Sequence, residues 1–174
     1  ISQRSLVSET LLDVDRRIFE VNYFGTVALT KALLPHFKSK KSGQFVIISS
    51  VVAKIGTPLR SSYSASKHAL HGFFDRLRAE CYDDGIEVTL ICPGFVNTDV
   101  SINALTGKGD KQGTKDKATA NGLSPEYFAK KAVKSISRSR QEVVIAGGLE
   151  SLAVYVKRFF PRLLSRMVRK VDVT

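Results

Sequence analysis

The chain has 174 residues, enough for one domain with a hydrophobic core, and carries a net charge of +11. Its 43% hydrophobic and 25% charged content is ordinary for a globular protein, and no apolar run reaches the roughly 18 residues that a membrane span needs. Two cysteines, Cys81 and Cys92, are too few for a disulfide framework, and Cys92 ends an apolar run that favours a buried reduced thiol. We expect any membrane anchor to lie upstream of this chain.

The positive charge is concentrated in the second part of the chain. Residues 1–100 hold 12 Lys and Arg against 10 Asp and Glu, whereas residues 101–174 hold 15 against 6. A nucleic-acid-binding protein would interleave basic and aromatic residues or carry a known binding module, so we expect no nucleic-acid partner. An anionic membrane surface or an anionic substrate fits the asymmetry, and so does a solvated face opposite a core.

Residues 10–40 predict a long amphipathic helix. Thr10 or Asp13 is expected to cap its start, and Pro35 to end or kink it. Its apolar residues recur at steps of three and four: Leu11, Leu12, Val14, Ile18, Val21, Leu29, Ala32 and Leu33.

Two apolar runs downstream predict strands buried on both faces. Gln44–Ser50 is β-branched and apolar without alternation, which is typical of a parallel sheet. A second helix is predicted over 61–83 and closes at Gly85. The run Glu87–Cys92 predicts the next strand, which Pro93 and Gly94 stop.

The region 99–140 is predicted to act as a substrate lid. Residues 99–123 are polar and punctuated by glycines, and loops of this length in compact domains are usually lids or binding loops. Ser124 and Pro125 are expected to open a further helix.

A last predicted strand, Glu142–Ala146, precedes a basic amphipathic tail over 150–174 that Pro161 breaks once. Such a tail could pack on the sheet, lie on a membrane surface or cover the entrance for a lipophilic substrate. Strands alternate with helices, so the sequence predicts an α/β fold with a parallel sheet in one domain over 1–174.

Ser50, Tyr63 and Lys67 predict a proton-transfer site at the carboxyl edge of this sheet. Tyr63 and Lys67 share a face because they lie four apart on one helix, and the lysine charge is expected to lower the pKa of the phenol. Ser50 ends its predicted strand, and Pro93 follows the end of the next one. His36, His68 and His71 have no carboxylate or cysteine partners at ligand spacing, so we expect surface or structural roles for them and no metal site.

Four motifs in this order resemble the short-chain dehydrogenase/reductase family. The stretches NYFGTVALTKALLP, YSASKHAL and LESLAVYVKRFFP are similar to its member-seven group, in particular the B-type branch. The motifs are Val21-Asn22-Tyr23-Phe24-Gly25, Ile48-Ser49-Ser50, Tyr63-Ser64-Ala65-Ser66-Lys67 and Cys92-Pro93-Gly94-Phe95-Val96-Asn97-Thr98.

The resemblance implies a role for each matched residue. Tyr63 would be the general acid and base, Lys67 would hold the nicotinamide ribose, and Ser50, in preference to Ser49, would bind the substrate oxygen. Asn22 would open the helix and hold a water in a proton relay to Lys67, or bond a neighbouring backbone group. The residues implied to cradle the nicotinamide end are Pro93, Gly94, Val96 and Thr98.

The resemblance further implies a doubly wound Rossmann-like sheet, of which this chain is the C-terminal portion. The first βαβ unit, with its glycine-rich turn, is expected upstream, so we expect this chain alone to bind dinucleotide poorly and to aggregate from an exposed sheet edge. The implied cofactor is NADP or NAD, with NADP favoured, and the implied substrate is a small lipophilic carbonyl or alcohol.

Three further expectations concern assembly and place. The helices at 10–40 and 61–83 are implied to form a homodimer interface, and an endoplasmic reticulum membrane location is expected, with the cytoplasm as the alternative. The competing interpretations are a non-catalytic binding protein, a membrane-peripheral protein and an inactive fragment.

Overall fold

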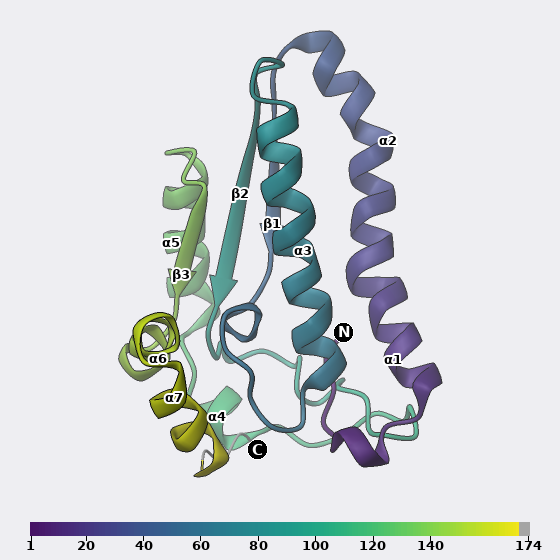
Figure 1. Ribbon diagram of the computed structural model, residues 1–174, viewed down its shortest axis with the longest axis vertical. Helices are drawn as coiled ribbons and strands as arrows, with labels where there is room; N and C mark the ends of the chain where they lie inside the picture. The colour runs from purple at the N-terminus through teal and green to yellow at the C-terminus, as the bar shows by residue number, and fades with distance from the viewer. Residues whose placement is uncertain (171–174) are drawn as a thin grey trace.

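Three parallel strands run through the centre of the molecule, in the order β1-β2-β3. The computed structural model describes residues 1–170, without the side chain of Lys170 (Figure 1). The strands are β1 (Gly43–Ile48), β2 (Ile86–Pro93) and β3 (Glu142–Ile145). Val46 pairs with Thr89, and Ile91 with Val143. This arrangement confirms the predicted α/β fold with a partial Rossmann-like parallel sheet.

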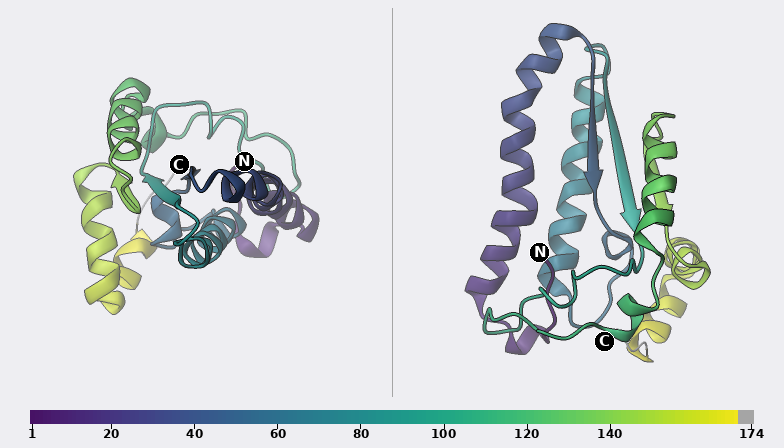
Figure 2. Two further views of the ribbon diagram at one scale, coloured as in Figure 1. Left: turned by 90° about the horizontal axis from the view of Figure 1, so that it is seen from above. Right: turned by 180° about the vertical axis from the view of Figure 1, so that it is seen from behind.

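Helices cover both faces of the sheet, which explains why the strand sequences do not alternate between apolar and polar residues. In Figures 1 and 2, α2 and α3 lie on one side of the strands and α5 on the other. The helices are α1 (Leu12–Phe19), α2 (Gly25–Lys40), α3 (Ser61–Glu80), α4 (Lys117–Ala120), α5 (Pro125–Ile136), α6 (Gly148–Phe159) and α7 (Pro161–Met167).

The larger part of the core lies between the sheet and α3. Phe45, Leu90, Leu70 and Phe74 are buried there, together with Val88. On the opposite face, a second cluster joins the sheet to α5 through three buried residues: Ile91, Ala132 and Ile145. The outer edge of β1 pairs with no strand among residues 1–170.

The long first helix differs from its prediction at three points. It begins after Leu11, without a side-chain cap, because the Thr10 hydroxyl donates to the Leu6 carbonyl instead. A five-residue π-helix, η2 (Glu20–Phe24), joins α1 to α2. The third point is Pro35, which does not end the helix; α2 continues to Lys40, the predicted end of the range 10–40.

The turn that carries Ser50 also differs from its prediction. β1 ends at Ile48, so Ser50 lies two residues beyond the strand and caps a short 3₁₀ helix, η3 (Val51–Ala53). The Ser50 hydroxyl accepts a hydrogen bond from the Val52 N–H at 3.3 Å. A strand cannot continue through a residue whose side chain caps a helical turn.

Residues 97–116 cross the carboxyl end of the sheet and pack beside the N-terminal segment (Figure 2). Leu105 forms a bridge with Gln3, and Ser101 and Ala104 are fully buried. The later part of the expected lid region is α5, which packs on the sheet. A lid role for the region 99–140 stays a prediction.

The part of the predicted tail that is described lies in α6, α7 and the short 3₁₀ helix η4 (Val168–Lys170), whereas 171–174 lie outside the described residues. Pro161 occupies the first position of α7. Val156 and Leu164 face inward against Val51 and Ile55 near the end of the sheet. Other apolar residues on these helices and at their junction are 49% exposed or more: Leu149, Leu152, Tyr155, Phe159, Phe160, Leu163 and Met167. Among the described residues, no helix has the length and apolar character needed to cross a membrane.

Candidate active site

The first two turns of α3 bring Tyr63 and Lys67 to the carboxyl ends of β1 and β2. Lys67 Nζ donates to the Ile48 carbonyl at 2.8 Å, at the last residue of β1. Ser50 Oγ lies 3.5 Å from the Pro93 carbonyl at the end of β2. The structure therefore brings together the three residues that the sequence placed at one edge of the sheet.

Tyr63 stands between two cavities. One, of about 330 Å³, is lined by Lys67, and the other, of about 100 Å³, by Arg60. The residues that line both cavities are Ser50, Tyr63, Pro93, Gly94, Val96 and Val100. A group bound in the larger cavity and a group bound in the smaller one would thus meet at Tyr63.

The pKa of Tyr63 is raised, and the expected lowering by Lys67 is wrong for this structure. Burial is the largest cause, because it removes water from the phenolate. A hydrogen bond with Ser50 and the charges of Arg4 and Arg60 oppose it without outweighing it. Lys67 Nζ lies 5.8 Å from the centre of the Tyr63 ring and points to the Ile48 carbonyl.

Burial also acts on Lys67. It lowers the pKa of the ammonium from 10.5 to about 8, because the charged form loses water. Burial therefore moves the pKa values of Tyr63 and Lys67 in opposite directions, and both groups are held in their neutral forms more readily than in water. Such perturbed neighbours in a cavity mark a candidate catalytic site.

Asn22 lies in the π-helix η2 and contacts Ser66, the residue next to Lys67. Its side-chain oxygen accepts from the Ile1 nitrogen at 2.7 Å. Its amide nitrogen donates to the Ile1 carbonyl at 2.9 Å and to Ser66 Oγ at 3.1 Å. Asn22 thus contacts the residue before Lys67, and a water relay from Asn22 to Lys67 stays a prediction.

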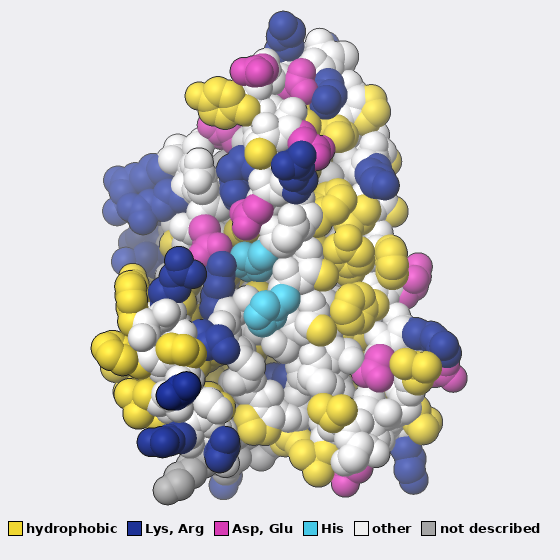
Figure 3. Space-filling model, viewed as in Figure 1, with side chains coloured by type: hydrophobic (Ala, Val, Ile, Leu, Met, Phe, Trp, Pro, Cys, Tyr) yellow, Lys and Arg dark blue, Asp and Glu magenta, His cyan; other side chains and the backbone are white. Residues whose placement is uncertain are grey.

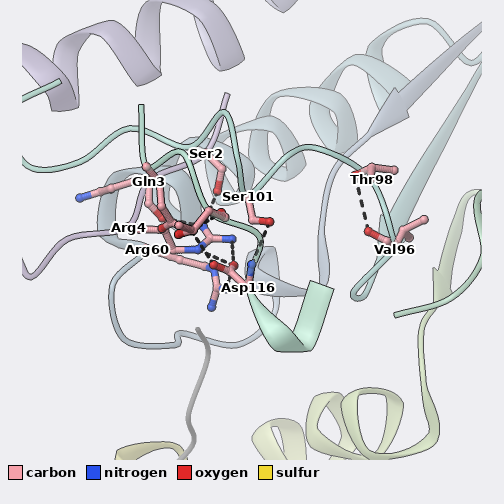
Figure 4. A network of polar contacts seen from close by, with 10 residues as sticks. Ser2, Gln3, Arg4, Arg60, Val96, Thr98, Ser101 and Asp116 are labelled. Atoms are coloured by element: carbon pink, nitrogen blue, oxygen red, sulfur yellow. Dashed lines mark hydrogen bonds and ion pairs between the residues drawn. The ribbon is translucent and has the colours of Figure 1, made fainter. Parts of the chain in front are cut away.

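Pro93, Gly94, Val96 and Thr98 line the larger cavity. Gly94 packs closely against Ala146 and Glu150. A Cβ at this position would lie 2.6 Å from the Ala146 methyl and from the Glu150 carboxylate, so the protein's own packing requires glycine here. The Thr98 hydroxyl points back to the Val96 carbonyl at 3.5 Å (Figure 4).

A buried ion cluster beside the smaller cavity had no signal in the sequence. Arg4 and Arg60 converge on Asp116, whose Oδ2 lies 2.6 Å from Arg4 and 3.4 Å from Arg60 (Figure 4). All three side chains are almost fully buried. Arg4 and Asp116 are 112 residues apart, so no local pattern could have paired them.

His71 has carboxylate and cysteine partners in space, although none was expected from the spacing of residues along the chain. His71 is buried, and its Nε2 lies 2.8 Å from Ser49 Oγ and 3.7 Å from Cys92 Sγ. Its Nδ1 lies 3.4 Å from Glu142 Oε2. These partners come from three different strand ends, so spacing along the chain could not reveal them. The described residues contain no cluster of three or more His, Cys, Asp or Glu that could hold a metal ion.

Comparison with known proteins decides the family. The family model for short chain dehydrogenases matches residues 1–109. The chain belongs to the short-chain dehydrogenase/reductase family.

Relatives within this family are similar along nearly the whole chain. "Dehydrogenase/reductase SDR family member 7B" of Rattus norvegicus is 46% identical over 97% of this chain and 52% of its own length. "Dehydrogenase/reductase SDR family protein 7-like" of Anopheles gambiae is 47% identical over 98% of this chain and 54% of its own length. The chain thus spans about half the length of these short-chain dehydrogenase/reductase relatives, as the resemblance implied.

Solved structures of the short-chain dehydrogenase/reductase family share the fold. A short-chain dehydrogenase of Streptomyces avermitilis superposes with a TM-score of 0.76 at 24% identity, covering 98% of this chain and 67% of that one. A family member from Burkholderia phymatum, in complex with NAD, gives 0.78 at 17% identity, covering 94% and 64%. A Burkholderia cenocepacia enzyme in complex with NADP gives 0.71 at 23% identity, covering 88% and 58%.

Proposed function

We propose that this short-chain dehydrogenase/reductase chain carries the catalytic part of an oxidoreductase that interconverts a carbonyl and a secondary alcohol. The meeting of Ser50, Tyr63 and Lys67 at the junction of two cavities carries the proposal. In the reduction, the carbonyl carbon gains a hydride and its oxygen gains a proton. Tyr63 gives that proton, and in the reverse direction it removes the proton of the alcohol.

Burial supports this role of Tyr63. Its raised pKa keeps the phenol protonated, which suits a proton donor in carbonyl reduction. Ser50 shares the cavity wall with Tyr63 and donates a hydrogen bond to the same substrate oxygen as charge develops on it. Lys67, on the next turn of α3, stands on the side of Tyr63 away from Arg60.

The larger cavity fits the nicotinamide end of NAD or NADP. When bound, this cofactor supplies or accepts the hydride. Lys67 would hold the ribose hydroxyls, while Tyr63, Pro93, Gly94, Val96 and Thr98 would enclose the ring and its ribose. We favour NADP, on the resemblance alone.

We also propose that the substrate is lipophilic. An apolar cavity of about 540 Å³ lies between α6, α7 and Phe95. It shares Ile55, Thr57, Phe95 and Glu150 with the small cavity at Tyr63. An apolar chain in this cavity would place a carbonyl near Tyr63, and burial of each CH₂ group contributes about 0.8 kcal/mol.

The test is reduction of medium- and long-chain ketones and aldehydes with NADPH or NADH, followed by nicotinamide absorbance. Tyr63→Phe removes the hydroxyl and keeps the ring, so we expect kcat to fall by about 10²–10⁴-fold. Tyr82→Phe makes the same change at an exposed residue and leaves kcat unchanged. Full activity of Tyr63→Phe, or no turnover of any such carbonyl, would contradict the proposal.

A peripheral membrane role is the second candidate, and the surface of α6 and α7 favours it. Figure 3 shows hydrophobic and basic side chains interleaved over these helices, at the lower left. The half-exposed Leu152, Phe159 and Met167 alternate with the basic Lys157 and Arg166. We propose that this surface contacts an anionic membrane and that this membrane is the endoplasmic reticulum. Phe159→Ser with Phe160→Ser should abolish co-sedimentation with anionic liposomes, and undiminished binding would contradict it.

A homodimer through the outer face of η2 and α2 is a further proposal. Four apolar side chains there are 40–63% exposed: Val21, Phe24, Leu29 and Leu33. Replacement of Leu29 by Glu should convert a dimer to a monomer in sedimentation velocity, because it places a charge in the apolar contact. A native chain that is already monomeric would exclude this interface.

A further inference from the structure

Three residues, from the ends of three strands, lie against the buried imidazole of His71 behind the candidate active site. The ring of His71, on the third turn of α3, lies against Ser49 after β1 and Cys92 in β2. Glu142, at the start of β3, faces the other side of the ring, and Lys54 Nζ binds the same Glu142 oxygen at 2.6 Å. No step of the proposed reaction uses this cluster.

The partners of the imidazole select one tautomer. Around Nε2 lie the Ser49 hydroxyl and the Cys92 thiol, which can both donate hydrogen bonds. Nδ1 lies 3.4 Å from the Glu142 carboxylate, which only accepts, and it forms no hydrogen bond with any other group within residues 1–170. Of the two neutral tautomers, only the one with its proton on Nδ1 presents an N–H to the Glu142 carboxylate and an acceptor at Nε2 to the Ser49 hydroxyl. The contact with His71, followed by that with Lys54, lowers the pKa of Glu142 to about 2, against burial, so the carboxylate stays ionised.

Ser49 is the link between this ring and the site. Its N–H donates to the Ile91 carbonyl at 2.7 Å, and its hydroxyl binds His71 at 2.8 Å, so both ends of the residue are fixed. The residue before it, Ile48, offers its carbonyl to Lys67, and the residue after it is Ser50. Ser49 itself is only 2% exposed, which excludes it as a nucleophile toward a substrate.

We propose that His71, oriented by Glu142, is a positioning residue that anchors Ser49. Through Ser49 it fixes the Ile48 carbonyl that holds Lys67 and the hydroxyl of Ser50 in the site. The effect on catalysis rests on the proposed function, whereas the effect on geometry does not.

Nuclear magnetic resonance of the ring nitrogens tests the geometry without any activity. In the 174-residue chain labelled with ¹⁵N, we expect His71 to carry its proton on Nδ1, and Glu142→Gln to shift the ring toward the other tautomer because a neutral amide can also donate. His36→Gln, at an exposed position, assigns one of the other signals and leaves that of His71 unchanged. A proton on Nε2 in the native chain, or no response to Glu142→Gln, would overturn the proposal.

Hydrogen exchange then separates anchoring from general stability. His71→Leu should speed exchange of the Ser49 amide at least tenfold, with the Val88 amide in the centre of β2 unaffected. His71→Gln keeps an acceptor for the Ser49 hydroxyl and should restore slow exchange. Equal acceleration at Ser49 and Val88, or none at Ser49, would contradict the proposal.

Kinetics give the last readout where carbonyl reduction is observed. We expect His71→Leu to lower kcat more than tenfold with KM changed less than threefold, and His71→Gln to recover kcat to within threefold. Absence of turnover in the native chain would count against the proposed function, and the tautomer and exchange results would still decide the role of His71. An unchanged kcat in His71→Leu would exclude a catalytic effect of the anchor.

Discussion

Lys67 loses part of its hydration because it is buried beside the cavity. Burial holds its pKa at about 8, so folding disfavours the charged form. Between pH 8 and 10.5 the unfolded chain therefore binds more protons than the folded one, and stability rises with pH in that window. Below pH 8 the full penalty is present.

Lys67→Met should accordingly stabilise the chain while removing the group that we propose to hold the cofactor. We expect the free energy of unfolding at pH 7 to rise by about 1–3 kcal/mol, from a pKa shift of this size, and the gain to shrink toward pH 10. Urea unfolding followed by circular dichroism at both pH values measures it, and Lys130→Met, at an exposed site of α5, serves as the control. A loss of stability at pH 7, or a gain independent of pH, would show that burial is not the cause.

Asp116 presents the opposite case, a buried charge that two arginines compensate. Burial raises its pKa, but hydrogen bonds from Arg4 and Gln112 and the charges of Arg4 and Arg60 together bring the pKa below its ordinary value. Asp116→Asn leaves two buried guanidinium groups facing a neutral amide, and we expect it to cost about 3–5 kcal/mol of stability.

Thermal unfolding measures this loss, and Asp99→Asn provides a matched control. Asp99 is 71% exposed and pairs with Lys115, so its replacement should cost about 1 kcal/mol or less. Because the Asp116 pKa is depressed on folding, its contribution is present above the unfolded pKa and disappears as the pH falls through the folded one. Equal costs for the two variants would refute the buried cluster as a source of stability.

At the scale of elements, the turn between α3 and β2 depends on one glycine. Gly85 has φ = +67°, and a Cβ there would collide with the Lys41 carbonyl at the end of α2. The turn thus brings together the ends of two helices and two strands, and only glycine fits it without strain.

Gly85→Ala should therefore destabilise the fold by about 1–3 kcal/mol, through left-handed backbone strain and the collision. Gly72→Ala is the contrasting variant, because Gly72 lies within α3 with no atom near its missing Cβ. It should raise stability by up to about 1 kcal/mol, through helix propensity. Chemical unfolding of both variants gives the comparison, and a neutral Gly85→Ala would contradict the close approach.

Local sequence patterns predicted the elements well, and long-range contacts account for part of what they missed. The strand near Glu142 and the helix beginning near Ser61 follow from apolar runs and turn residues. The capping of η3 by Ser50 is a local contact with the Val52 N–H that the apolar run concealed, and α2 continues through Pro35 despite the poor helix propensity of proline. The clusters around His71 and Asp116 join residues that no period along the chain relates.

On the scale of the whole molecule, this chain corresponds to about half the length of the relatives that it matches. Residues 1–170 supply the cavity beside Lys67, the candidate proton donor Tyr63 and the apolar cavity under α6 and α7. Within these residues the outer edge of β1 pairs with no strand. The relatives of the chain are about twice as long as the chain itself. The cavity of about 330 Å³ beside Lys67 is the one that we propose for the nicotinamide end of the cofactor.

The 174-residue chain should accordingly bind reduced nicotinamide mononucleotide about as tightly as NADH. If only the nicotinamide end is held, the two dissociation constants should agree within about threefold, or ~0.7 kcal/mol. Calorimetric titration of both ligands measures this, with Lys67→Met weakening both to the same degree and adenosine monophosphate failing to compete. Binding of NADH more than tenfold tighter than the mononucleotide, or competition by adenosine monophosphate, would place an adenosine site within these residues and contradict the expectation. A match would mean that the proton-transfer machinery and the nicotinamide contacts form one unit that folds without the dinucleotide-binding turn.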